Sequence, residues 1–103
     1  MLCKSPFHVD ILPSAVMDIA KMHLFYENIE RGLGEIFRDH IIGEIDKLEE
    51  NAGIDEQRLG YYFRPENRFH QGIYYKMNGQ NVVVWRILDM RFNPKRITNA
   101  IRG

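Results

Sequence analysis

The chain has 103 residues, of which 45% are hydrophobic and 27% charged, so we expect one globular domain with a small core. No apolar run approaches the roughly 20 residues that a membrane-spanning helix needs, and no secretory signal is visible, so we expect a cytoplasmic protein without a membrane partner. The single cysteine, Cys3, has no partner for an internal disulfide, which fits a reducing compartment.

Acidic and basic residues occupy different parts of this chain, although its formal net charge is zero. Residues 17–56 contain eleven acidic and four basic side chains, whereas residues 57–103 contain nine basic and two acidic ones. This asymmetry indicates either that the molecule uses its separated charges to orient a binding partner, or that its charged helix faces are merely solvated.

The N-terminal third predicts a strand followed by a helix. Phe7, Val9 and Ile11 recur with the period of two that is typical of a strand. Pro13 suits the first turn of a helix, where its missing N–H costs nothing. The spacing of apolar residues then predicts a helix from Ser14 to about Glu30. Its apolar stripe consists of Ala15, Ile19, Met22, Tyr26 and Ile29.

A second helix is predicted after the break at Gly32-Leu33-Gly34. Gly53 is a suitable stop for it. Each helix alone is marginal in water, so we expect an antiparallel helical hairpin that packs on a sheet. The apolar stripe of this second helix consists of Phe37, Ile41, Ile45, Leu48 and Ala52.

The C-terminal half predicts three further strands and a short helical end. The expected segments are a strand at Leu59–Arg64, a turn at Pro65-Glu66-Asn67, strands at Arg68–Met77 and Asn81 to about Arg91, and helical turns within Lys95–Arg102. The predicted order is therefore β-α-α-β-β-β. This is an α+β fold in which a helical hairpin packs on a twisted, mostly antiparallel sheet.

The last two strands form the strongest local signal in the chain. Asn78-Gly79 predicts a two-residue type I′ turn, because both residues tolerate positive φ. The run Val82–Trp85 is apolar on both faces, which indicates a central strand. Arg86 follows and is predicted on the same face as Val84. It needs either an acidic partner, such as Asp89 or an acid on a helix, or an open, ligand-facing end of that strand.

Residue patterns for metal, cofactor or covalent chemistry are lacking. The four histidines, His8, His23, His40 and His70, have no ligand-like spacing, so no metal is expected. There is no Gly-rich phosphate loop, and we expect no cofactor. Acid–base catalysis on RNA would need basic side chains beside tyrosines. The alternative is that the tyrosines simply pack in the core.

Three segments together resemble a known family. They are Ala15-x-x-Asp18-Ile19; Tyr26 followed by Gly32-Leu33-Gly34-x-x-Phe37; and Arg68-Phe69 leading through Ile73-Tyr74-Tyr75 and Val82-Val83-Val84 to Arg91-x-x-Pro94. In their order and spacing these segments are similar to the RelE/ParE superfamily of type II toxin–antitoxin toxins, and most closely to its ParE-like, plasmid-stabilisation branch.

The resemblance implies a toxin that is neutralised by a cognate antitoxin protein and that inhibits DNA gyrase without being an enzyme. On this interpretation the basic C-terminal segment engages the target, through Arg86, Arg91, Lys95, Arg96 and Arg102. The helical hairpin and a sheet edge receive the antitoxin, through Tyr26, Phe37 and Trp85.

The resemblance leaves two alternatives open. One is a RelE-like endoribonuclease that cuts messenger RNA on the ribosome with Arg68, Arg91, Tyr74 and Tyr75. The other is a non-toxic interaction module. Gln71 replaces an arginine of the RNA-cleaving members and Ile97 lies near their tyrosine position, so the ParE-like interpretation is favoured.

Overall fold

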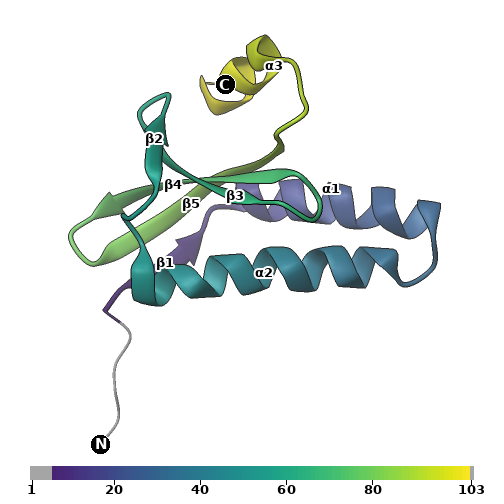
Figure 1. The fold of residues 1–103 in the computed structure, drawn as a ribbon, viewed down its shortest axis with the longest axis horizontal. Coiled ribbons are helices and arrows are strands. Elements are labelled where there is room, and N and C mark those ends of the chain that lie inside the picture. The colour runs from purple at the N-terminus through teal and green to yellow at the C-terminus, as the bar shows by residue number, and fades with distance from the viewer. Residues whose placement is uncertain (1–5, 103) are drawn as a thin grey trace, which may run out of the picture.

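The computed structural model describes residues 6–102 and has a five-stranded sheet with helices on both faces (Figure 1). The elements are β1 (His8–Ile11), α1 (Pro13–Ile29), α2 (Leu33–Asn51), β2 (Glu56–Arg58), β3 (Tyr61–Glu66), β4 (Gln71–Asn78), β5 (Asn81–Asp89) and α3 (Pro94–Arg102). The sheet order is β1-β5-β4-β3-β2, with β1 parallel to β5 and the other pairs antiparallel. The predicted α+β fold is confirmed, with β2 as an additional edge strand.

Two separate cores lie on the two faces of the sheet. The larger one lies under α1 and α2, and the smaller one lies under α3 (Figure 1). Strand β5 lies between β1 and β4 and contributes to both cores, so the predicted central position of Val82–Trp85 is confirmed. The smaller core consists of Phe63, Tyr74, Leu88 and Ile101.

Both helices lie where the apolar periodicity predicts them. All five residues of the second stripe are buried, and in α1 Ala15, Ile19 and Tyr26 are buried. The prediction for Ile29 is wrong, because this side chain is 61% exposed at the last residue of α1. Apolar periodicity does not show where a helix extends past the edge of the sheet on which it packs.

The tight turns differ from the prediction. Strands β4 and β5 pair up to Asn78 and Asn81, so their loop is Gly79-Gln80. Only Gly79 has positive φ there, at 63°, a pattern typical of a type II′ turn. The type I′ prediction for Asn78-Gly79 is therefore wrong. Two consecutive positive φ values occur instead at Leu59 and Gly60, which join β2 to β3.

Strand β2 was not predicted, and the turn after β3 lies later than expected. Residues Glu56–Arg58 are exposed and polar, so they lack the apolar alternation that marks a strand. Pro65 and Glu66 belong to β3, where they pair with Gly72 and Gln71, and the chain turns after them.

A β-bulge in β5 reverses the orientation of the residues that follow it. Tyr75 pairs with Val84, whereas Tyr74 pairs with Arg86, so Trp85 is the extra residue. Val84 therefore faces the helical hairpin, whereas Arg86 lies opposite Tyr74 of the smaller core, and its guanidinium reaches Asp18 of α1. The prediction that these two residues share a face is wrong, because a single inserted residue inverts a period of two.

Candidate functional site

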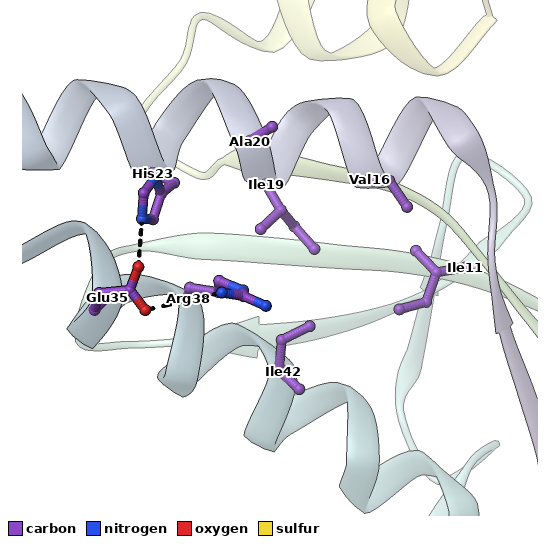
Figure 2. A pocket seen from close by; sticks show the side chains of 8 residues that line it. All are labelled: Ile11, Val16, Ile19, Ala20, His23, Glu35, Arg38 and Ile42. Carbon is purple, nitrogen blue, oxygen red and sulfur yellow. Dashed lines mark hydrogen bonds and ion pairs between the residues drawn. The ribbon is translucent and has the colours of Figure 1, made fainter.

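A groove of about 390 Å³ lies between α1 and α2, and the end of β1 contributes to it (Figure 2). Ile11, Ile19 and Ile42 give it apolar walls. His23 and Glu35 face each other across one end, where His23 Nε2 lies 3.0 Å from Glu35 Oε1. The groove is thus an apolar channel with a polar end, a shape that suits an amphipathic partner segment.

The helical hairpin exposes more large apolar side chains than scattered surface residues would explain. The exposed ones on these two helices are Val16, Met17, Leu24, Phe25, Ile29 and Ile36. Among them, Val16 lies on the wall of the groove. This surface is the strongest candidate for a protein-binding site.

The junction between the two helices is fixed by Glu27. Its carboxylate accepts hydrogen bonds from Gly32 N–H at 2.9 Å and from Gly34 N–H at 3.0 Å. The bond from Gly32, supported by that from Gly34, outweighs partial burial and holds the pKa of Glu27 below its ordinary value. A carboxylate at the start of α2 also interacts favourably with the helix dipole. The groove walls are therefore held in fixed relative positions.

The five predicted target-binding residues divide into two groups. Lys95, Arg96 and Arg102 project from α3 and are exposed. Arg86 is held by Asp18 of α1, which is the ion pair with a helix acid that the sequence left open. Arg91 is exposed but pairs with Asp89, whose Oδ2 accepts from Nη2 at 2.7 Å. This hydrogen bond raises the pKa of Arg91 above its ordinary value.

The residues predicted to contact an antitoxin do not form one surface. Phe37 is 0% exposed, and Tyr26 is buried beside it with ring centroids 5.1 Å apart. Both belong to the larger core. Trp85 is half-buried on the sheet, where its ring lies 5.5 Å from that of Tyr61. Periodicity identifies buried positions, and Tyr26 and Phe37 contribute to the protein's own core.

The residues of the alternative ribonuclease site are not brought together either. Tyr75 is 0% exposed in the larger core, and Tyr74 is buried in the smaller core on the opposite face. Burial, with the hydrogen bond to Asp55, raises the pKa of Tyr75 well above its ordinary value. Arg68 donates from Nη1 to His40 Nε2 at 2.9 Å. Neither tyrosine is placed to exchange a proton with a bound RNA.

Within residues 6–102, no group of three or more metal-binding side chains is found, and no helix has the length and apolar character needed to cross a membrane. Cys3 lies outside the described residues.

No protein-family model matches the sequence, and no curated protein is significantly similar to it. A solved structure described as "Chromosomal ParDE TA system from P. aeruginosa" contains a chain with a similar fold. The TM-score is 0.73 at 14% sequence identity, and the match covers 84% of this chain and 99% of that chain. This likeness confirms the predicted RelE/ParE-like fold.

Proposed function

We propose that this chain is the toxin component of a type II toxin–antitoxin system, a ParE-like inhibitor of DNA gyrase that a cognate antitoxin neutralises. The observation that carries the proposal is the likeness in fold to a chain of the P. aeruginosa ParDE system, which covers nearly all of that chain. The sequence motifs that resemble the ParE-like branch support it independently.

The helical hairpin supports the antitoxin part of this proposal. The groove between α1 and α2 has apolar walls, and the exposed Val16 lies on one of them, so this surface is unfavourable to leave in water. An antitoxin segment with an apolar stripe would bury this surface. The binding site is then the groove wall at Val16 and Ala20, in place of Tyr26 and Phe37.

The exposed cations of α3 support the target-binding part. Lys95, Arg96 and Arg102 have no acidic partner within 4.0 Å among residues 6–102, so their charges are available to a partner. Arg96 lies 4.0 Å from the ring centroid of Phe92, which orients its guanidinium. A complex of DNA gyrase with DNA would present negative charge that attracts such a cluster of basic side chains.

The direct test is a supercoiling assay with purified chain, DNA gyrase, ATP and relaxed plasmid. We expect inhibited supercoiling or accumulated cleaved plasmid. Unperturbed supercoiling by folded protein contradicts the gyrase assignment. Site-specific cleavage of translated messages during growth arrest would instead support the ribonuclease alternative.

The contribution of α3 is best tested by charge removal, because deleting residues 93–103 would uncover the smaller core beneath Ile101. The variant is Lys95→Gln with Arg96→Gln and Arg102→Gln. We expect at least tenfold weaker inhibition, since each charged contact at a partner surface is worth about 1 kcal/mol.

A matched control removes three cations from the helical hairpin, by Arg31→Gln, Arg38→Gln and Lys47→Gln. It lowers the net charge by the same amount on another part of the molecule. Inhibition at wild-type strength is expected. Equal loss in both variants would show that overall charge, and not the α3 surface, acts on the target.

A further inference from the structure

A second cavity, of about 360 Å³, lies between α1, the end of β5 and α3. It is separate from the groove between α1 and α2, because the two share no lining residue. Met22, Phe25 and Phe92 belong to its apolar lining. Phe25 is 53% exposed, so a partner can reach this wall from solvent. The volume lies at the lower end of the range for ligand cavities, which suits a single large side chain.

Both carboxylates that line this cavity are already neutralised. Asp18 accepts two hydrogen bonds from the guanidinium of Arg86, at 2.7 and 2.9 Å. Asp89 accepts two from the guanidinium of Arg91, at 3.0 and 2.7 Å. Among residues 6–102, the lining therefore contains no unpaired carboxylate that would repel an anion.

Two cations of the lining have no such counter-ion. Lys21 of α1 and Arg96 of α3 are exposed, and neither has an acidic partner within 4.0 Å among residues 6–102. Arg96 instead stacks on Phe92, with its guanidinium carbon 4.0 Å from the ring centroid. The cavity thus combines apolar walls with uncompensated positive charge. This combination favours an apolar group that has an anion beside it.

The position of the cavity connects it to the surface proposed to bind the antitoxin. Val16 of α1 lines the groove and Phe25 lines the second cavity, so the two open on opposite flanks of this helix. At 3.6 residues per turn, Met17 and Leu24 lie on the outward face between these flanks. Both are more than half exposed. A segment that leaves the groove would therefore cross apolar side chains on its way to the cavity.

We infer that this cavity receives a bulky apolar side chain of the antitoxin, with acidic residues on either side of it meeting Lys21 and Arg96. The inference rests on the proposed function for the identity of the partner. The cavity, its apolar walls and its two unpaired cations do not depend on it.

The test uses capped tripeptides as probes. Glu-Phe-Glu, Gln-Phe-Gln and Lys-Phe-Lys keep the aromatic ring and differ in charge, whereas Glu-Gly-Glu keeps the carboxylates without the ring. Each peptide is titrated into the ¹⁵N-labelled full chain, and amide chemical shifts are followed. We expect Glu-Phe-Glu to shift the amides of Met22, Ile87 and Leu88. It should bind about tenfold more tightly than Gln-Phe-Gln or Glu-Gly-Glu, and Lys-Phe-Lys should bind most weakly.

A pair of double variants tests the role of the cations. Lys21→Gln with Arg96→Gln should abolish the preference for Glu-Phe-Glu over Gln-Phe-Gln. The matched control, Lys95→Gln with Arg102→Gln, removes the same charge from positions of α3 outside the lining. It should keep the preference.

A pair of single variants tests the apolar wall. Phe25→Ala should weaken the binding of Glu-Phe-Glu about fivefold, because the ring loses part of its contact surface. Leu24→Ala is the control, since Leu24 lies beside Phe25 in sequence but does not line the cavity. Both side chains are exposed, so neither change removes a core residue.

Four results would overturn the inference. Equal affinity of Glu-Phe-Glu and Gln-Phe-Gln would mean that the cations do not select the ligand. Equal affinity of Glu-Phe-Glu and Glu-Gly-Glu would mean that the cavity takes up no side chain. The others are shifts centred on Val16 and Ala20 instead of Leu88, and the absence of saturable binding. The titration needs no gyrase, so its failure is distinguishable from failure of the proposed function.

Discussion

The carboxylate of Asp18 and the guanidinium of Arg86 form a two-point ion pair that joins α1 to β5. Arg86 Nε donates to Asp18 Oδ2 at 2.7 Å, and Nη2 donates to Oδ1 at 2.9 Å. Asp18 Oδ2 also accepts from Ile87 N–H at 3.0 Å, while Arg86 Nη1 donates to the carbonyl oxygen of Ala100 in α3 at 2.9 Å. One pair thus connects the helical hairpin, the central strand and the C-terminal helix.

Removing this carboxylate should destabilise the whole fold. The hydrogen bond to Asp18 raises the pKa of Arg86, although burial acts in the opposite direction. Asp18→Ala leaves a half-buried guanidinium without its counter-ion. We expect a loss of about 2–3 kcal/mol in the free energy of unfolding, between the values for exposed and fully buried pairs. Urea denaturation measures it, and Asp39→Ala on the exposed face of α2 should change stability by less than about 0.5 kcal/mol.

Two glycines of α2 should respond to alanine with opposite signs. A Cβ at Gly34 would lie 2.5 Å from the carbonyl oxygen of His23, so Gly34→Ala should cost about 1–3 kcal/mol by forcing the helices apart. A Cβ at Gly43 meets nothing within 4 Å, so Gly43→Ala should stabilise by about 1 kcal/mol through helix propensity. Thermal unfolding of both variants decides this. Tolerance of alanine at position 34 would contradict the close approach.

The hydroxyl of Tyr75 joins the sheet to the end of α2. It donates to the carboxylate of Asp55 and accepts from Gly53 N–H at 3.0 Å. Tyr75→Phe leaves both partners short of a bond, and we expect a loss of about 1–3 kcal/mol. The control is Tyr62→Phe, because the half-buried ring of Tyr62 stacks on Tyr75 at 5.3 Å. An equal loss in both variants would contradict the role assigned to the Tyr75 hydroxyl.

Asp89 should make stability depend on pH on the acid side. Burial acts to raise its pKa, but hydrogen bonds from the side chain and backbone N–H of Arg91 outweigh it and lower the pKa from its ordinary value of 3.8. The unfolded chain therefore binds the proton more readily. The stabilisation is fully present above the pKa that Asp89 has in the unfolded chain. It is lost as the pH falls through the lower pKa that Asp89 has in the folded protein.

Urea midpoints measured from pH 6 to pH 2.5 test this dependence. The wild-type midpoint should fall from about pH 5 downward. Asp89→Asn and Arg91→Gln should each flatten this fall, because each removes one member of the pair. Arg38→Gln, at an exposed position on α2, should keep the wild-type slope. Identical slopes in all four proteins would exclude Asp89 as the responsible group.

Much of the fold could be predicted because its signals are local. The stripe from Phe37 to Ala52 and the alternation of Phe7, Val9 and Ile11 each reflect one element burying one face. Strand β2 carries no such signal, because its three residues are exposed and only the hydrogen bonds to β3 make it a strand. The candidate groove was predicted only as a general surface, since the exposed Val16 and the buried Ile19 are equally apolar in sequence.

The sequence by itself determined the order of the elements, the helical hairpin and the buried stripes, because these follow from periodicity over neighbouring residues. The tertiary structure alone decided the bulge at Trp85, the partner of Arg86 and which buried polar atoms lack a partner. A bulge is defined by pairing across strands, and Asp18 lies 68 residues from Arg86. Whether a buried polar atom is paired depends on segments that meet only after the chain has folded.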